Sequence, residues 1–126
     1  MEKEWILEET RCVMEKDTAK ALGSGDLPVY ATPALAAFME HTAKELLKPM
    51  LKEGETTVGT HLHLDHLKAT GVGKTVRSRA ELLQGEGRKM TLRVEVFEGE
   101  VLIGTAIHER VIVDGNKFMN KINHMI

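Results

Sequence analysis

The sequence contains little of what several specialised protein classes depend on. Cys12 is its only cysteine, which excludes an internal disulfide and any zinc site built from several cysteines. No hydrophobic run approaches the length that is needed to cross a membrane, so no membrane association is expected. Positive charge is not in excess either, because the formal net charge is -2. This near balance of charge argues against nucleic-acid binding.

The chain has the size and composition of one ordinary globular domain. Its 126 residues, with 42% hydrophobic and 29% charged side chains, are enough for a single domain spanning residues 1–126 with a real core. The first five residues show no basic region followed by an apolar core, and we therefore expect a cytoplasmic protein. For Cys12 we expect a packed strand thiol rather than a catalytic nucleophile.

A helix is predicted over residues 32–51, and the rest of the chain is organised around it. Thr32 can cap its first free amides, and Pro33 suits the first helical position because its missing N–H costs nothing there. Glu40 is the one acidic side chain in the first half of this otherwise small or apolar helix. Such a carboxylate must be desolvated, hydrogen-bonded or open to a cleft. The ordinary alternative is an ion pair with Lys44, one turn further on.

Most of the remaining sequence alternates with the period of a β-strand. An edge or outer strand is expected within residues 4–14, with Trp5, Leu7, Cys12 and Met14 as its packing positions. Four longer strands are expected at 56–69, 75–83, 90–96 and 101–113, followed by a short amphipathic helix from Gly115. Four consecutive strands favour a meander. The predicted class is therefore α+β, with the helix on one face of an antiparallel sheet whose exposed edges favour dimerisation.

The predicted strand over residues 56–69 carries three histidines. Strict alternation places two sets on opposite faces: Val58, Thr60, Leu62, Leu64 and His66 on one, and Gly59, His61, His63, Asp65 and Leu67 on the other. His61, His63 and Asp65 therefore share a face and are a candidate metal site. A cupin-like site would need a glutamate shortly after His63, and none follows before residue 71. We expect no metal.

Several short segments occur in an order that is typical of one protein family. They are Ala31-Thr32, Met39-Glu40, Gly54-Glu55, Val58-Gly59-Thr60, His66 with Ala69-Thr70, Gly73-Lys74-Thr75-Val76, Glu86-Gly87-Arg88 and His108-Glu109-Arg110. With these segments the chain resembles hotdog-fold thioesterases, and within them the fluoroacetyl-CoA thioesterase family. The resemblance implies a curved antiparallel sheet wrapped around a long central helix, with two subunits forming the active unit.

The resemblance also implies a set of site residues. The catalytic threonine, glutamate and histidine of the family match Thr32, Glu40 and His66. The glycine that lets the substrate approach the strand backbone matches Gly59, and an arginine near the substrate carbonyl matches Arg110. The implied activity is hydrolysis of a small acyl-CoA thioester to the free acid and coenzyme A. Coenzyme A enters as part of the substrate, no other cofactor is expected, and the protein is expected to be a homodimer, or a tetramer in which two such dimers pair.

One departure from the family pattern bears on the acyl group. The member that selects the fluorinated substrate has phenylalanines in a lid before the threonine, whereas residues 23–27 here are Gly-Ser-Gly-Asp-Leu. An ordinary short acyl group is therefore expected, carried by coenzyme A or by a carrier protein. Lys68 and Lys74 are the cations expected to bind the phosphates of coenzyme A.

Other interpretations of the same residues remain open from the sequence. Thr32 is a good helix cap whatever the function, and His66 on an apolar strand face is more often a core histidine bonded to backbone. At the level of the whole protein, a non-catalytic module that binds or senses acyl-CoA would keep the fold and the pocket. A hydratase is disfavoured because its aspartate and histidine pair is not apparent.

Overall fold

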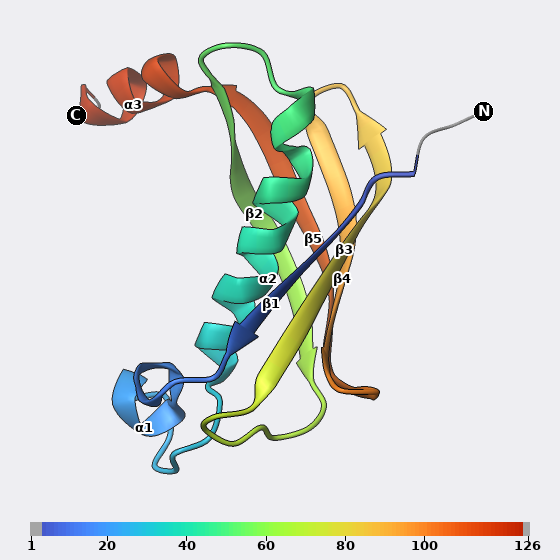
Figure 1. The fold of residues 1–126 in the computed structure, drawn as a ribbon. Coiled ribbons are helices and arrows are strands. Elements are labelled where there is room, and N and C mark those ends of the chain that lie inside the picture. Colours follow the sequence, from blue (N-terminus) through green and yellow to red (C-terminus); the bar gives the residue numbers. More distant parts are fainter. Residues whose placement is uncertain (1–3, 125–126) are drawn as a thin grey trace.

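The computed structural model describes residues 4–124 and consists of one curved antiparallel sheet with a long helix across its concave face (Figure 1). The five strands are β1 (Ile6–Cys12), β2 (Glu55–His66), β3 (Thr75–Glu86), β4 (Lys89–Glu98) and β5 (Val101–Asp114). The predicted α+β arrangement of an edge strand, a central helix and four further antiparallel strands is confirmed.

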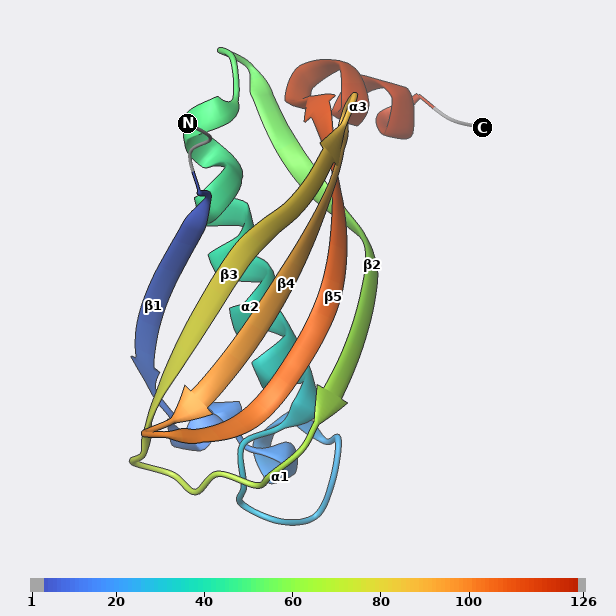
Figure 2. The ribbon, with the colours of Figure 1, turned by 90° about the vertical axis from the view of Figure 1, so that its right-hand side faces the viewer.

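The order of the strands corrects the predicted meander. Hairpins join β3 to β4 and β4 to β5, but β2 pairs with β5, so the order is β1-β3-β4-β5-β2. The segment 67–74 crosses the end of the sheet instead of turning back on β2, as Figure 2 shows. Its backbone is held there by other parts of the chain, through a bridge from Gly71 to Val29 and bonds between Gly73, Lys74 and Val13. Among the described strands, β1 and β2 are thus the two sheet edges.

The central helix α2 (Thr32–Leu47) follows the predicted range, and a 3-10 turn, Lys48–Met50, extends it. Leu35, Phe38 and Met39 point into the sheet and are fully buried, each contributing roughly 1.5–3 kcal/mol of hydrophobic stabilisation. The close approach of helix and sheet requires a glycine on β5, because a Cβ on Gly104 would lie 2.8 Å from Leu35 Cδ2. The glycine therefore lets the first half of α2 pack closely against β5.

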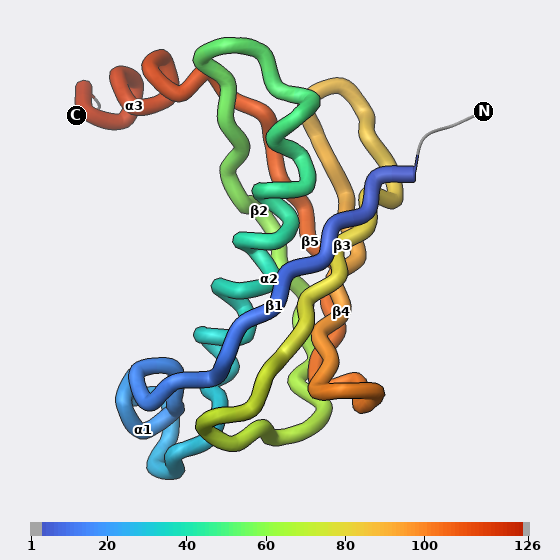
Figure 3. The backbone as a smooth tube through the Cα atoms, in the orientation of Figure 1, coloured from blue at the N-terminus to red at the C-terminus, as the bar shows by residue number. Residues whose placement is uncertain are grey.

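The shorter elements lie at the two ends of the sheet (Figure 3). The 3-10 turn Glu15–Asp17 and helix α1 (Ala19–Leu22) precede α2, at the end where β2 finishes. At the opposite end, α3 (Gly115–Asn123) confirms the predicted C-terminal helix. The carboxylate of Asp114 caps this helix by accepting a hydrogen bond from the Lys117 backbone N–H. None of the described helices has the length and apolar character of a membrane span.

A β-bulge in β2 overturns the predicted alternation of its side chains. The register against β5 shifts between Gly59 and His61, which inserts one extra residue into β2. Gly59 therefore faces α2, where its missing Cβ would lie 2.7 Å from Glu40 Oε2. His66, seven residues on, faces α2 as well. The expectation that Gly59 and His66 lie on opposite faces was wrong, because strict alternation has no provision for a bulge.

The packing expected for Cys12 and Met14 was also wrong. Cys12 is exposed at the end of β1, and the side chain of Met14 is half exposed, while Val13 between them is buried. The backbone of Val13 pairs with Gly73 and Lys74 where β1 has ended, and this turns Val13 into the core. Trp5 and Leu7 do pack against the core, as predicted.

Candidate active site

Thr32 and His66 meet where the end of β2 lies against the start of α2. Thr32 is the first residue of the helix and His66 the last of the strand, and Thr32 Oγ1 lies 2.8 Å from His66 Nδ1. The N-cap position belongs to Ala31, which makes no side-chain bond to the helix. The prediction that Thr32 caps the helix was therefore wrong. Its hydroxyl is bonded to an imidazole instead.

The surroundings of His66 favour its neutral form. Its Nε2 is buried and forms no hydrogen bond with the described residues. Burial lowers the pKa of His66 below the ordinary value of 6.5, and the nearby backbone at Lys68 opposes this effect. A neutral imidazole in contact with a hydroxyl can accept its proton, which is the arrangement used in general base catalysis.

A cavity of about 350 Å³ lies beside this threonine and histidine pair. The start of α2, the end of β2, Tyr30 and Lys68 line it, and its volume suits a small ligand. Burial, with the nearby Asp17 carboxylate, raises the pKa of Tyr30 to about 12, while Arg11 acts in the opposite direction. The Tyr30 hydroxyl is therefore neutral. The first turn of α2 also brings the positive end of its dipole to the cavity.

The two lysines that were predicted to bind substrate differ in position. Lys68 lines the cavity beside His66 and is exposed, so its ammonium can reach an anion at the mouth. Lys74 is exposed as well but does not line this cavity, and its carbonyl accepts a hydrogen bond from the Val13 amide. The structure thus brings Lys68 to the threonine and histidine pair, and not Lys74.

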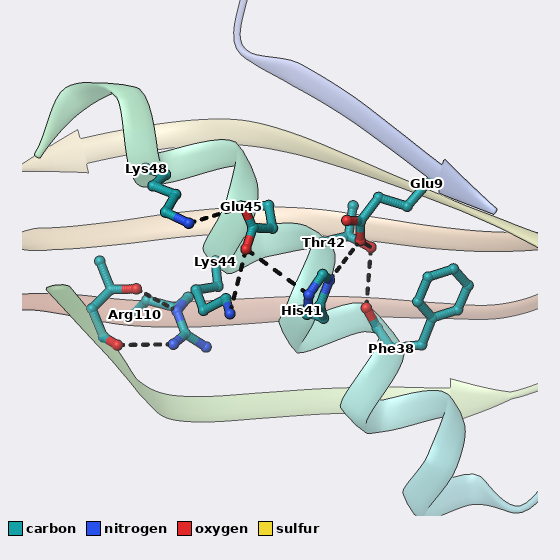
Figure 4. A network of polar contacts seen from close by, with 9 residues as sticks. Glu9, Phe38, His41, Thr42, Lys44, Glu45, Lys48 and Arg110 are labelled. Atoms are coloured by element: carbon teal, nitrogen blue, oxygen red, sulfur yellow. Dashed lines mark hydrogen bonds and ion pairs between the residues drawn. The ribbon is translucent and has the colours of Figure 1, made fainter. Parts of the chain in front are cut away.

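Glu40 lies in a different group of residues on the concave face. Its Oε2 is 3.9 Å from both His108 Nε2 and Arg110 Nη1, and its side chain is 43% exposed. The alternative of a surface pair with Lys44 was wrong, because the Lys44 ammonium lies 3.4 Å from Glu45 (Figure 4). Glu40 instead faces two buried nitrogen-bearing side chains from β5.

Arg110 is held in a fixed orientation under α2. Its Nε donates to Thr57 Oγ1 at 2.8 Å and its Nη2 to the Thr57 carbonyl at 3.0 Å. Nη1 lies 3.1 Å from His108 Nε2. Burial lowers the pKa of Arg110 and Glu40 opposes this effect, yet a guanidinium stays charged at neutral pH. Arg110 therefore brings a buried positive charge to within 4 Å of the Glu40 carboxylate.

His108 was not predicted as a site residue. Its side chain is fully buried, and its Nδ1 lies 2.7 Å from the His61 carbonyl. A carbonyl only accepts and Arg110 only donates, so Nδ1 carries the proton and Nε2 accepts from Arg110. The signal in the sequence is a histidine two residues before Arg110, on a strand face that also carries Ala106 and must therefore point inward.

Within one chain, Glu40 lies apart from the other two predicted catalytic residues, Thr32 and His66. Thr32 and Glu40 are eight residues apart on α2, which corresponds to about 12 Å between their Cα atoms. Gly59 and His66 are likewise about 23 Å apart along β2 if it is fully extended. No contact joins Glu40 to Thr32 or His66 in the part of the chain that the structure describes. The chain therefore presents two half-sites, the threonine and histidine pair (Thr32, His66) and the glutamate cluster (Glu40, Gly59, His108 and Arg110).

The candidate metal ligands lie outside both half-sites. His61, His63 and Asp65 are exposed along β2, at the free edge of the sheet. No group of three or more His, Cys, Asp or Glu side chains between residues 4 and 124 is arranged to hold a metal ion.

The sequence and the fold are both similar to those of known thioesterases. The profile of a family described as fluoroacetyl-CoA-specific thioesterase matches residues 13–116. The fluoroacetyl-CoA thioesterase of Streptantibioticus cattleyicolor is 36% identical over 94 residues, which are 75% of this chain and 68% of that protein.

Solved structures agree with this similarity. A structure of the fluoroacetyl-CoA thioesterase superposes with a TM-score of 0.91 at 30% identity, over 100% of this chain and 98% of that one. A hot-dog-like protein from Thermanaerovibrio acidaminovorans superposes with a TM-score of 0.85 at 23% identity, over 93% of this chain and 87% of that one. The expected hotdog fold is therefore confirmed.

Proposed function

Since the chain belongs to the fluoroacetyl-CoA-specific thioesterase family, we propose that it hydrolyses small acyl-CoA thioesters to the free acid and coenzyme A. The observation that carries this proposal is the bond between Thr32 Oγ1 and His66 Nδ1 beside a cavity at the start of α2. A hydroxyl activated by a neutral imidazole, next to backbone N–H groups that can stabilise an oxyanion, supplies what acyl transfer requires.

The proposed reaction uses both half-sites. In one route His66 takes the proton of the Thr32 hydroxyl as its oxygen attacks the thioester carbonyl carbon, and this proton passes to the departing sulfur of coenzyme A as the C–S bond breaks. Glu40 then takes a proton from a water that attacks the Thr32 ester, and the ester C–O bond breaks as the Thr32 oxygen regains a proton. In the alternative route the Glu40 carboxylate attacks the thioester, His66 protonates the departing sulfur, and water hydrolyses the resulting anhydride to regenerate the carboxylate. In both routes Arg110 stabilises the developing negative charge, and water supplies the oxygen of the free acid.

Both half-sites serve one thioester only if a second copy of the chain takes part. The β2 edge has no partner strand among the described residues, which leaves it free to pair with β2 of another copy. Pairing about a two-fold axis is antiparallel, so Gly59 of one copy lies opposite His66 of the other when the axis passes between Leu62 and His63. This register brings the glutamate cluster of one subunit to the threonine and histidine pair of its partner. We therefore propose a homodimer with two shared active sites.

The residues around the cavity favour an ordinary short acyl group. Ser24 lines the cavity, and Leu27 is 65% exposed, so the stretch 23–27 presents no aromatic side chain to the substrate. Lys68, at the mouth, is the cation best placed to bind a phosphate of coenzyme A. No metal or other cofactor takes part in the proposed reaction.

The experiment that tests this function is release of free thiol from a panel of acyl-CoA esters of increasing length. The wild-type protein is expected to release thiol from short esters, with kcat/KM falling as the acyl chain outgrows the cavity. Thr32→Ala should abolish release while retaining binding of coenzyme A. Binding of acyl-CoA by the wild-type protein without any release would contradict the enzyme and support a binding module.

A further inference from the structure

We propose that His108 is a positioning residue whose neutral ring orients the guanidinium of Arg110 toward Glu40. The kinetic consequence of this inference rests on the proposed hydrolysis, while the arrangement itself is a property of the folded chain. His108 and Arg110 lie two residues apart on β5 and both face α2. His108 is not in a position to reach the thioester itself, because its side chain is fully buried.

The hydrogen bonds of Arg110 show what His108 adds. A guanidinium has five N–H donors in one plane. Two of them go to Thr57, through Nε and Nη2, and one on Nη1 goes to His108 Nε2. The two bonds to Thr57 hold the edge of the guanidinium that carries Nε and Nη2, and the bond to His108 holds Nη1 at the other edge. His108 therefore restrains the Nη1 edge against tilting about Thr57, and with it the direction of the second Nη1 hydrogen.

This second hydrogen faces the open side of the glutamate cluster. Nη1 lies 3.9 Å from Glu40 Oε2, which is longer than a hydrogen bond, so the carboxylate and the guanidinium both remain available to bind a substrate. The space between them lies over Gly59, where a Cβ would be 2.7 Å from Glu40 Oε2 and 3.2 Å from Nη1. A thioester oxygen or an attacking water that enters this space meets a fixed donor on one side and a carboxylate on the other.

Only one protonation state of His108 supports this arrangement. The Nδ1–H donates to the His61 carbonyl at 2.7 Å, which leaves the Nε2 lone pair for Arg110. A protonated ring would place an N–H against Nη1 and two positive charges about 3 Å apart. The charged groups that face the ring are Arg110 from β5 and Glu40 from α2, with His61 nearby on β2. Burial also lowers the pKa of His108, in agreement with a neutral ring.

Two conservative variants separate the two bonds of the ring. In His108→Gln the side-chain oxygen reaches the position of Nε2 and can accept from Arg110. In His108→Asn the side-chain nitrogen reaches the position of Nδ1 and can donate to the His61 carbonyl, but no atom reaches Arg110. A residue that only packs the core or anchors β2 should tolerate asparagine at least as well as glutamine.

We expect kcat to fall most in the variant that loses the hydrogen bond to Arg110. We expect His108→Gln to keep kcat within about 10-fold of the wild type and His108→Asn to lower it about 100-fold, with little change in KM. In an Arg110→Lys background the two variants should no longer differ in kcat, because lysine has no guanidinium for residue 108 to orient. Equal losses in both variants that follow the melting temperature would overturn the proposal.

A second measurement does not depend on turnover. NMR of ¹⁵N-labelled imidazole distinguishes the two neutral tautomers of histidine and follows their protonation. We expect His108 to remain the neutral Nδ1–H tautomer at pH values where exposed histidines are already charged, in the wild type and in the inactive Thr32→Ala variant. An Nε2–H tautomer, or titration at the ordinary value of 6.5, would overturn the proposal. If the wild-type protein hydrolyses no acyl-CoA, the proposed function is contradicted. The NMR measurement of the His108 tautomer then still tests the arrangement of His108 and Arg110.

Discussion

Thr32 Oγ1 and His66 Nδ1 lie 2.8 Å apart, although 34 residues separate them in the chain. The bond joins the first residue of α2 to the last residue of β2, and neither residue needs it to complete its own element. Removing the hydroxyl should therefore affect activity far more than stability.

The first prediction concerns this hydroxyl. Thr32→Ala should lower kcat by at least about 100-fold and change the free energy of unfolding by less than about 0.5 kcal/mol, because Thr32 is exposed and does not cap the helix. Thr32→Ser keeps the hydroxyl and should retain most of the activity. Thiol-release kinetics and urea unfolding measure the two quantities. A loss of more than about 1 kcal/mol in Thr32→Ala would mean that the hydroxyl has a structural role after all.

The second prediction compares two glutamates on the same helix. Glu40→Gln should lower kcat by orders of magnitude, because it removes the carboxylate that faces Arg110 and His108. Glu45→Gln is the matched control, since Glu45 contacts Lys44 and Lys48 on the outer side of α2 (Figure 4). It should leave kcat unchanged and have little effect on stability, because exposed ion pairs of this kind contribute little. Near-normal turnover in Glu40→Gln would exclude Glu40 from the reaction.

The sequence predicted much of this fold because its signals are local. The helix from Thr32 and the strands that carry Met90 to Val96 follow from the spacing of apolar residues, and the structure confirms them. The pairing of β2 with β5 depends on where segment 67–74 crosses the sheet, which no periodicity reports. The bulge that turns Gly59 toward Glu40 is likewise a property of strand pairing and not of composition.

The candidate site was predicted less completely than the fold. The catalytic roles of Thr32, Glu40 and His66 came from the resemblance to a family. The residues alone favoured a helix cap for Thr32 and a core histidine for His66, and they left Glu40 open between a functional carboxylate and an ion pair with Lys44. The partner of each side chain is decided by contacts between distant elements, such as Glu40 with β5. His108 was missed because its position two residues before Arg110 indicates only that it shares the inward strand face, and its bonds to Arg110 and to the His61 carbonyl are visible only in the folded chain.

The third prediction uses Gly59. Gly59→Ala should lower kcat by about 100-fold, because its Cβ would displace the Glu40 carboxylate from a position 2.7 Å away. The cost to stability should stay near 1 kcal/mol, since the displaced atom ends a flexible and partly exposed side chain. Gly71→Ala is the control, because no atom of residues 4–124 outside its immediate neighbours lies within 4 Å of the added Cβ. Full activity in Gly59→Ala would show that the carboxylate need not occupy this position.

The fourth prediction concerns pH. Burial lowers the pKa of both His66 and His108 from the ordinary value of 6.5. Between the lowered values and 6.5 the unfolded chain binds more protons than the folded chain, so stability should rise with pH through this window. The acidic limb of kcat/KM should lie below 6.5, where His66 becomes protonated. The melting temperature and kcat/KM measured against pH test both statements, and an acidic limb at or above 6.5 would contradict the assignment of His66 as the base.

The last prediction decides whether one active site is shared between two chains. Thr32→Ala and Glu40→Gln proteins should each be inactive, because each lacks one half-site in every subunit. When they are denatured together in equal amounts and refolded, about half of the dimers should contain one chain of each kind. In such a dimer, the intact Glu40 of one chain meets the intact Thr32 and His66 of the other at one of the two sites.

Mixing should therefore restore about a quarter of the wild-type activity, while each variant refolded alone should stay inactive. A mixture of Thr32→Ala with His66→Ala is the matched control, since both changes remove the same half-site and no shared site can be complete. If all three catalytic residues act within one chain, the first mixture should be as inactive as the control. In that case α2 would have to bring Glu40 and Thr32 to one substrate across about 12 Å of helix, which its geometry does not allow without a large rearrangement.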